Sequence, residues 1–374
     1  MSLLDGPLGR LEALAQRGRM RVLHPIMGAD FASNDYLGLA GSALLCDLTR
    51  AALDSGFAPG AGAARLLRGN HDAFTALEAE AAAHFGSGGA LYFGTGYAAN
   101  LALFSALPAA RDLVLHDALI HASARDGMRL GSAETRSFAH NDVTAARDTL
   151  RDWRAQGGKG QIWLAVESLY SMDGDFSPLA DLVALANAED AFLIVDEAHA
   201  TGIWGPEGRG VAAAFAAQQN LITLHTCGKA LGVQGALVCA DPVLIATLIN
   251  RARSFIYSTA PSPLLAQVLR GVLTHLATDS TRRTALLARV ARAADLARGI
   301  GLAPSGSQIQ PVILPGDAAC LAAAAALQHQ GFDIRAIRAP TVPKGAERLR
   351  LSLTLNPAEA ELTAAFSALH KVIQ

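Results

Sequence analysis

The sequence has few cysteines and few charges. Its cysteines are scattered and none belongs to a CxxC pair: Cys46, Cys227, Cys239 and Cys320. This spacing argues against a disulfide framework and a structural zinc site, so we predict no metal, and reduced thiols in a cytoplasmic protein. Charged residues make up 17% of the chain and the formal net charge is -2. That balance offers no electrostatic reason to expect a nucleic-acid partner.

Long hydrophobic runs are also missing. The opening stretch "MSLLDGPLGRLEALAQRGRMR" contains acidic residues and no continuous apolar region, so it predicts an amphipathic helix and not a secretory signal. The richest apolar stretch, "CLAAAAALQHQG", is too short to cross a bilayer and predicts a packed helix that ends near Gly331. We therefore expect no membrane span.

The middle of the chain alternates short apolar runs with helical segments rich in alanine and leucine. The runs are "ALYF", "DLVLH", "QIWLAVE", "AFLIVD", "LITLHT" and "GALVCA". Strands that are apolar throughout and alternate with helices predict an α/β fold, with a mainly parallel sheet covered on both faces. After about residue 270 the pattern changes to two long helices, three short strands and a final helix from about Ala358. This ending predicts a smaller α+β domain.

With 374 residues the chain is long enough for one large domain and one smaller domain. We expect an N-terminal segment over residues 1–40 that packs with the small domain. A large cofactor-binding domain is expected over 41–275 and a small C-terminal domain over 276–374.

The string "VDEAHATG" follows one predicted strand and has two possible meanings. Asp-Glu-Ala-His is a string associated with nucleotide-driven helicases, which also need an upstream G-x-x-x-x-G-K-[ST] loop to hold phosphates and magnesium. No such loop precedes Val195, and Gly228-Lys229 is followed by Ala230. The missing loop therefore argues against the helicase interpretation, which stays an alternative outside this class of site.

The second interpretation joins Asp196 to a lysine downstream. In parallel sheets, ligands bind at the carboxyl ends of the strands, where Asp196 and Thr226 are predicted to lie. A lysine in a cleft, such as Lys229, can form a Schiff base with an aldehyde, and a carboxylate can keep a pyridine nitrogen protonated. These are the two groups that pyridoxal 5'-phosphate requires.

A phosphate-binding turn completes this pattern. "FGTGYAANLALFSAL" places a glycine turn between a strand and a helix, so the amides of Gly96 and Tyr97 are available to an anion. Each feature alone has a plainer meaning: Asp196 as a cap, Lys229 as a solvated surface group, the glycines as a turn. Their combination favours a pyridoxal-phosphate site.

At these residues the chain resembles the α-oxoamine synthase family of fold type I pyridoxal-phosphate enzymes. The matching strings run through nearly the whole chain in the family's order: "FASNDYLGLA", "FGTGYAANLALFSAL", "DALIHAS", "FAHNDV", "ESLYSMDGDFSPL", "IVDEAHATGIWGPEGRGV", "HTCGKALGVQGALV", "FIYSTAPSP", "APTVP" and "RLRLSLT". The resemblance implies a large domain built on a mainly parallel sheet of seven strands and a smaller α+β C-terminal domain.

The resemblance also assigns the catalytic and cofactor residues. Lys229 would bond to the cofactor and move protons at the substrate Cα, and Asp196 would pair with the pyridinium nitrogen. His199 would hydrogen-bond the phenolic oxygen, and His121 would stack on the ring. Further cofactor contacts are implied for Gly96, Tyr97, Ser171 and Thr226. Ser258 and Thr259 would reach the phosphate of a neighbouring subunit, which implies a homodimer with shared active sites.

For substrates, the resemblance implies that Arg350 grips the amino acid's carboxylate, for which a bidentate guanidinium is suited. The plain alternative is a charge on a surface strand face. Asn34 would line the site, while Arg21, or alternatively Arg19, and Thr341 would help to hold the acyl partner.

The activity implied is the condensation of L-alanine with a pimeloyl thioester, of coenzyme A or acyl-carrier protein, with loss of CO2 and free thiol, in biotin biosynthesis. Another reaction of the same family is the alternative, with glycine and an acetyl group or with a long-chain acyl thioester. A protein that keeps the fold for binding alone would not need Lys229, Asp196 and His121 intact.

The chain departs from the family pattern in three places. Phe74 stands where members usually have a histidine, Cys227 stands beside Thr226, and Val166-Glu167-Ser168 replaces "TEG". None of them involves Lys229, Asp196 or His199, so they bear on the substrate more than on the cofactor. Glu197, prominent in the helicase interpretation, receives no role.

Overall fold

The computed structural model describes residues 2–374. The chain forms two compact units. We call Asn34–Arg289 the large unit, and Met1–Ser33 together with Val290–Gln374 the small unit. The three domains expected from the sequence, over residues 1–40, 41–275 and 276–374, remain a prediction.

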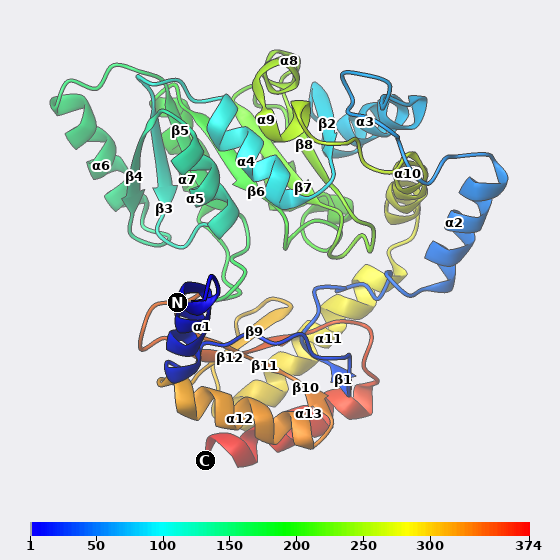
Figure 1. The fold of residues 1–374 in the computed structure, drawn as a ribbon, viewed down its shortest axis with the longest axis vertical. Coiled ribbons are helices and arrows are strands. Elements are labelled where there is room, and N and C mark those ends of the chain that lie inside the picture. Colours follow the sequence, from blue (N-terminus) through cyan, green and yellow to red (C-terminus); the bar gives the residue numbers. More distant parts are fainter. Residues whose placement is uncertain (1) are drawn as a thin grey trace. The chain divides into compact units, whose positions relative to one another are not determined.

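The large unit is built on a sheet of seven strands in the order β2-β8-β7-β6-β5-β3-β4 (Figure 1). Strand β8 is antiparallel to its neighbours β2 and β7, and the other neighbours pair in parallel. The bounds are β2 (Gly89–Phe93), β3 (Leu113–Asp117), β4 (Glu134–Phe138), β5 (Ile162–Glu167), β6 (Phe192–Asp196), β7 (Leu221–Thr226) and β8 (Ala236–Ala240). The predicted α/β fold with a mainly parallel sheet is confirmed.

Strand β4 is the one strand of this sheet that the apolar pattern did not predict. Its sequence, "ETRSF", is polar, and most of its side chains are exposed or half-buried. It pairs only with β3, at the edge of the sheet. An edge strand buries less of its surface than a central one, so it needs no continuous apolar run and gives no such signal.

Helices of the large unit cover both faces of this sheet. Their bounds are α2 (Ala43–Asp54), α3 (Asp72–Phe85), α4 (Gly96–Ala106), α5 (Ala122–Leu130), α6 (Val143–Ala155), α7 (Leu179–Ala188), α8 (Pro242–Arg251), α9 (Arg253–Ile256) and α10 (Pro263–Thr278), with short 3-10 turns η1 (Pro206–Gly208) and η2 (Val211–Phe215). Helix α11 (Thr281–Gly299) runs across the division between the units.

Alternation along β5 shows which helices lie on which face. Trp163 and Ala165 belong to an apolar cluster with α4, α5, α8 and α9. Leu164 and Val166 belong to a second cluster with α6 and α7. Because successive strand side chains point to opposite faces, Glu167 follows Ala165 onto the α4–α5 face. By the same alternation Asp196, at the end of β6, lies on that face too.

The small unit contains an antiparallel sheet in the order β11-β12-β9 and a two-stranded parallel pair, β1-β10. Its elements are β1 (Ala29–Asp30), β9 (Ile309–Ile313), β10 (Phe332–Asp333), β11 (Arg335–Ile337), β12 (Arg348–Ser352), α1 (Asp5–Gln16), α12 (Asp317–His329) and α13 (Glu359–Ile373). Phe31, Leu349 and Phe366 lie in one apolar cluster of this unit. The predicted C-terminal α+β pattern is confirmed.

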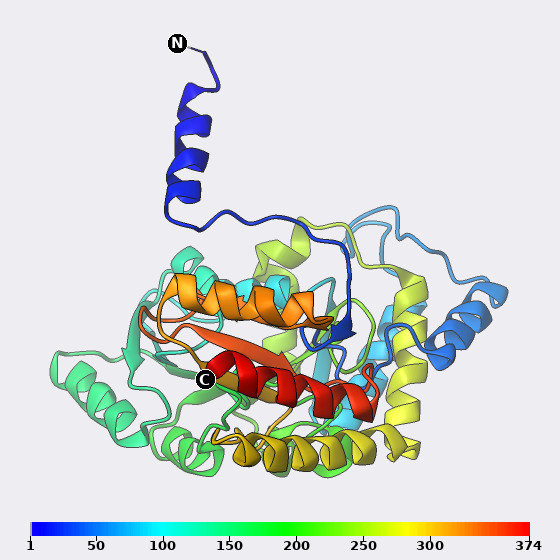
Figure 2. The same ribbon diagram turned by 90° about the horizontal axis from the view of Figure 1, so that it is seen from below.

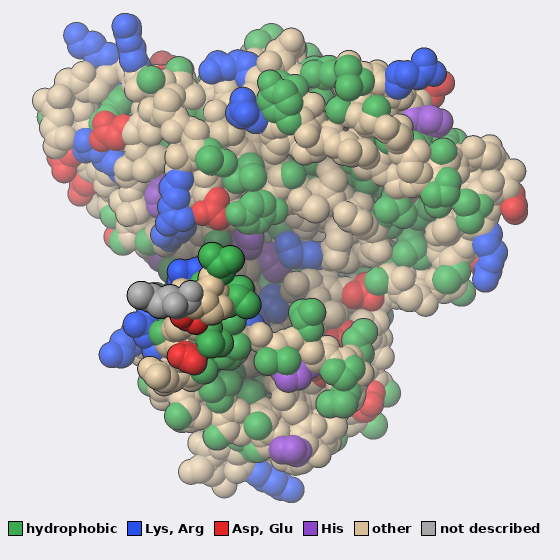
Figure 3. All heavy atoms as spheres, viewed as in Figure 1, with side chains coloured by type: hydrophobic (Ala, Val, Ile, Leu, Met, Phe, Trp, Pro, Cys, Tyr) green, Lys and Arg blue, Asp and Glu red, His purple; other side chains and the backbone are tan. Residues whose placement is uncertain are grey.

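Helix α1 confirms the predicted N-terminal helix, yet it buries none of its residues. Figure 2 shows it standing away from α12 and α13 of the same unit. Its apolar side chains are open to solvent, among them Leu8 and Leu11, and green side chains are visible on this helix in Figure 3. A helix that leaves such side chains uncovered is suited to packing against another surface.

Across residues 2–374, the structure has no helix with both the length and the apolar character that a membrane span needs.

Candidate active site

A cavity of about 480 Å³ lies within the large unit, at the carboxyl ends of β5, β6 and β7 and beside the first turn of α4. Most of the site residues predicted for this unit line it: Asn34, Gly96, Tyr97, His121, Asp196, His199, Thr226 and Lys229. The wall also includes residues to which the sequence assigned no role: Gly94, Thr95, Asn100, Ser123, Glu167, Ala198, Gly228, Gly232, Gln234 and Gly235.

Asp196 is held in one orientation by two N–H donors. The Asn100 side-chain amide donates to its Oδ2 at 3.0 Å, and the Ala198 backbone N–H donates to its Oδ1 at 3.0 Å. Asp196 is 8% exposed. Two N–H donors suit an ionised carboxylate in a buried place, which is the form that would hold a proton on a pyridine nitrogen.

A chain of hydrogen bonds connects Asp196 to His121. Asn100 Nδ2 also donates to Ser123 Oγ at 2.9 Å, and Ser123 Oγ lies 2.7 Å from His121 Nδ1. Burial lowers the pKa of His121, against the opposing effect of Asp196, while Lys229 lowers it further. A neutral imidazole with a fixed ring plane is suited to stacking on a planar cofactor. Asn100 and Ser123 are positioning residues that the sequence reasoning missed.

Tyr36 connects two of the predicted site residues. Its hydroxyl lies 2.7 Å from His199 Nδ1 and donates to Asn34 Oδ1 at 3.0 Å. Tyr36 is fully buried. The tyrosine stood in the matching string "FASNDYLGLA", but no role was predicted for it, because its contact with His199 spans 163 positions of the chain.

Lys229 and the N-terminus of α4 both lie beside the carboxyl end of β7. Lys229 Nζ donates to Thr226 Oγ1 at 3.3 Å, and Thr95 caps α4 by accepting the Ala98 N–H. Gly96 packs so tightly there that a Cβ would lie 2.5 Å from Thr226 Cγ2. The open N-terminus of α4, the amine and the carboxylate thus surround one cavity, and they fit the phosphate, aldehyde and ring nitrogen of pyridoxal 5'-phosphate.

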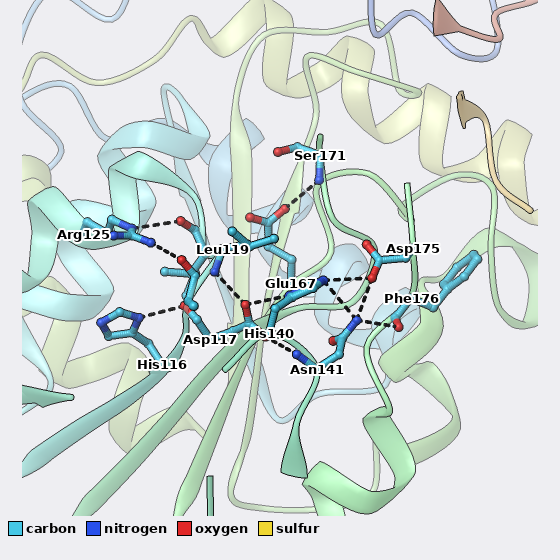
Figure 4. A network of polar contacts seen from close by, with 12 residues as sticks. His116, Asp117, Leu119, Arg125, His140, Asn141, Glu167, Ser171, Asp175 and Phe176 are labelled. Atoms are coloured by element: carbon cyan, nitrogen blue, oxygen red, sulfur yellow. Dashed lines mark hydrogen bonds and ion pairs between the residues drawn. The ribbon is translucent and has the colours of Figure 1, made fainter. Parts of the chain in front are cut away.

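A second polar network holds the segment that carries Ser171 (Figure 4). His140 Nδ1 lies 2.9 Å from Asp117 Oδ1, and His140 Nε2 lies 2.8 Å from Asp175 Oδ2. Burial by itself lowers the pKa of His140, but hydrogen bonds to Asp117 and Asp175 outweigh it and raise the pKa to about 10. The imidazolium therefore joins the end of β3 to the loop after β5.

We expect His140→Gln to destabilise the protein by about 1–3 kcal/mol, because it leaves the buried Asp117 without a cation. In the unfolded chain this histidine titrates near its ordinary value of 6.5, and in the folded chain near 10. Its stabilisation is therefore complete below pH 6.5 and is lost as the pH rises toward 10. Melting temperatures of both proteins should differ most at pH 6 and converge by pH 10. His329→Gln, at an exposed position, is the control. A difference that does not change with pH would contradict a charged His140.

The remaining cofactor residues predicted in the large unit lie elsewhere. Ser171 is buried and is not among the residues that line the cavity, but its backbone N–H donates to Glu167 Oε2 at 3.2 Å. Ser258 and Thr259 are exposed, just beyond α9.

The predicted substrate residues Arg21, Thr341 and Arg350 belong to the small unit. Arg21 and Thr341 are exposed there, as is Arg19. Arg350 lies in the middle of β12, is 6% exposed and donates to Ser352 Oγ at 2.7 Å. The alternative of a surface charge is therefore wrong for Arg350.

Two of the departures from the family pattern, Phe74 and Cys227, lie in the packed interior, whereas Glu167 of the third lines the cavity. Phe74 is fully buried, and the Arg65 guanidinium lies 4.6 Å from its ring centroid. Arg65 in turn pairs with Glu78 at 2.8 Å. Cys227 is fully buried, and burial raises the pKa of its thiol. Phe74 thus packs in the core beside this ion pair.

The α/β fold and the cavity are those of a pyridoxal-phosphate-dependent enzyme, and comparison with known proteins gives the same class. The chain belongs to the aminotransferase class I and II family, whose model matches residues 27–369. Within that family it is similar to 8-amino-7-oxononanoate synthases. The synthase of Anaeromyxobacter dehalogenans is 41% identical over 388 aligned residues, which cover 99% of this chain and 96% of the relative.

Solved structures of two different enzymes share this fold. The 8-amino-7-oxononanoate synthase of Francisella tularensis superposes with a TM-score of 0.77 at 28% identity, over 92% of this chain and 98% of that one. The serine palmitoyltransferase of Sphingomonas wittichii superposes with a TM-score of 0.88 at 26% identity, over 100% of this chain and 98% of that one.

Proposed function

We propose that the protein condenses L-alanine with a pimeloyl thioester and releases CO2 and the free thiol, giving 8-amino-7-oxononanoate for biotin biosynthesis, with pyridoxal 5'-phosphate as its cofactor. The observation that carries the proposal is the single cavity where Lys229, Asp196 and the start of α4 meet. The chain is similar to 8-amino-7-oxononanoate synthases over nearly the full length of both chains. This similarity favours L-alanine and a pimeloyl thioester over glycine with an acetyl group and over a long-chain acyl thioester.

Pyridoxal 5'-phosphate supplies a ring that takes up negative charge from the amino acid's Cα. Lys229 Nζ removes and returns the Cα proton, and Thr226 Oγ1 accepts a hydrogen bond from that amine. Asp196 holds a proton at the ring nitrogen, since Asn100 and Ala198 fix its two oxygens. The amides at the start of α4 bind the phosphate, with Thr95 as the helix cap.

Around these groups, His121 would cover one face of the bound ring and His199 would hydrogen-bond the phenolic oxygen. Tyr36 holds the His199 ring in place. Ser171 adds a further contact. Arg350 binds the amino acid's carboxylate, for which a bidentate guanidinium is suited. Asn34, Arg21 and Thr341 bind the substrates.

The working form we propose is a homodimer, with Ser258 and Thr259 of each chain reaching the phosphate in the other. Both residues are exposed on the single chain, next to the 72% exposed Tyr257. The uncovered apolar side chains of α1 also suit a subunit contact. The acyl carrier is coenzyme A or acyl-carrier protein.

The test is a substrate matrix. Alanine, glycine and serine are each paired with pimeloyl, acetyl and palmitoyl thioesters, and CO2 and free thiol are measured. We expect turnover with alanine and the pimeloyl thioester to exceed the other pairs by at least about tenfold, as one or two well-placed contacts can discriminate. Turnover only with glycine and acetyl-coenzyme A would reject the proposed substrates while leaving the cofactor assignment intact.

A further inference from the structure

Glu167 is the last residue of β5 and lies beside Asp196. The two strands are parallel, and Glu167 and Asp196 are register partners on the face that carries α4 and α5. Neighbours in register on one face of a sheet point the same way, so two carboxyl groups stand side by side at the base of the cavity. Both line it.

The two carboxyl groups have different partners. Asp196 accepts an N–H on each oxygen. Within residues 2–374, Glu167 accepts only the Ser171 backbone N–H, through Oε2, and its Oε1 has no hydrogen-bond partner (Figure 4). Glu167 is 2% exposed. A buried oxygen without a hydrogen-bond partner lowers the stability of the folded state. A group bound in the cavity can supply the missing partner.

The charge of Glu167 follows from this environment. Burial raises its pKa well above the ordinary value, and the carboxylate of Asp196 raises it further, against the opposing effect of Lys229. In a pair of adjacent carboxyl groups, the one with fewer donors keeps the proton. A protonated carboxyl has one O–H to donate and still accepts through its other oxygen.

We propose that Glu167 is a neutral carboxylic acid that accepts the Ser171 N–H through Oε2 and donates its Oε1–H to an acceptor oxygen of the ligand in the cavity. That oxygen belongs either to the cofactor or to the amino-acid substrate. The proposal rests on the proposed function only for the identity of this ligand, and it is independent of the acyl donor.

Glutamine is the matched variant because it is neutral, accepts through its carbonyl oxygen and donates through its amide. Methionine has a similar length and cannot donate. Glu167→Gln therefore preserves the proposed contacts, and Glu167→Met removes them.

The first readout uses the protein without cofactor. If Glu167 is neutral when folded, it holds a proton that the unfolded chain loses above its ordinary value of 4.5. Wild-type stability should then fall as the pH rises past 4.5, and Glu167→Gln should escape this loss. The melting temperature of the variant minus that of the wild type should grow between pH 5 and pH 8. An exposed control, Glu12→Gln, should show no such growth. A constant difference for Glu167→Gln overturns the proposal, even if Glu167→Met does not fold.

The second readout is ligand binding, followed by the visible absorption of the cofactor. We expect the Kd for pyridoxal 5'-phosphate in Glu167→Gln to stay within about twofold of the wild type. In Glu167→Met, an increase of about tenfold in the Kd for pyridoxal 5'-phosphate would place the acceptor oxygen on the cofactor. An unchanged cofactor Kd with a tenfold weaker L-alanine Kd would place it on the amino acid. If Glu167→Met loses only thermal stability and binds both ligands normally, the donor role is wrong. Failure of the pimeloyl assay would leave each of these results standing.

Discussion

Lys229→Ala should lower turnover at least about 10³-fold, because it removes the amine that we propose takes the Cα proton. Lys229 is the amine that donates to Thr226 Oγ1 in the cavity. The variant should still bind pyridoxal 5'-phosphate, because the start of α4 and Asp196 remain. Borohydride should attach the cofactor irreversibly to the wild type at Lys229 and leave it dialysable from the variant.

Lys159→Ala is the matched control, because Lys159 is exposed and lies outside the cavity. It should keep wild-type turnover and the borohydride-fixed cofactor. Substantial activity in Lys229→Ala would reject the assignment of proton transfer to Lys229. Wild-type protein that stays colourless with added cofactor would reject the cofactor itself.

Asp196→Asn should lower turnover by about 10²–10³-fold, while Glu197→Gln should lower it far less. The amide introduced by Asp196→Asn is neutral and could not hold a proton on the ring nitrogen through charge. The adjacent Glu197 points elsewhere: it accepts from Ser168 Oγ at 2.7 Å and from the backbone N–H of Ala212 at 2.5 Å. Steady-state rates per folded protein, with the visible spectrum of each variant, measure the difference.

Glu197→Gln should instead reduce stability, by about 1–3 kcal/mol, since an amide would face backbone N–H groups that now donate to a carboxylate. Glu197 is fully buried, and burial raises its pKa to about 7 against the lowering effect of these hydrogen bonds. Equal losses of turnover in the two variants would contradict the separation of roles. The residue that received no role from the sequence is thus a structural one, which holds the start of η2.

Much of the site could be predicted because its residues carry local signals. A buried strand that ends at Asp196 and a glycine turn that opens α4 can both be recognised within short windows of sequence. Strand β4 could not, because an edge strand needs no apolar run. Tyr36, Asn100 and Ser123 were missed for another reason: Asn100 meets Asp196 across 96 positions, and no local pattern encodes such a contact.

By itself, the sequence determined the succession of strands and helices, the strand-end placement of Asp196 and Thr226, and the presence of Lys229 nearby in the chain. These depend on hydrophobic periodicity and on turn chemistry, which are local properties. Only the tertiary structure decided how three buried carboxyl groups differ. Asp196 accepts an N–H on each oxygen, and Glu197 accepts from Ser168 and Ala212. Glu167 accepts a single N–H through Oε2, which is why we propose that it keeps its proton. Proton affinity depends on desolvation and on donors that folding brings together from distant positions.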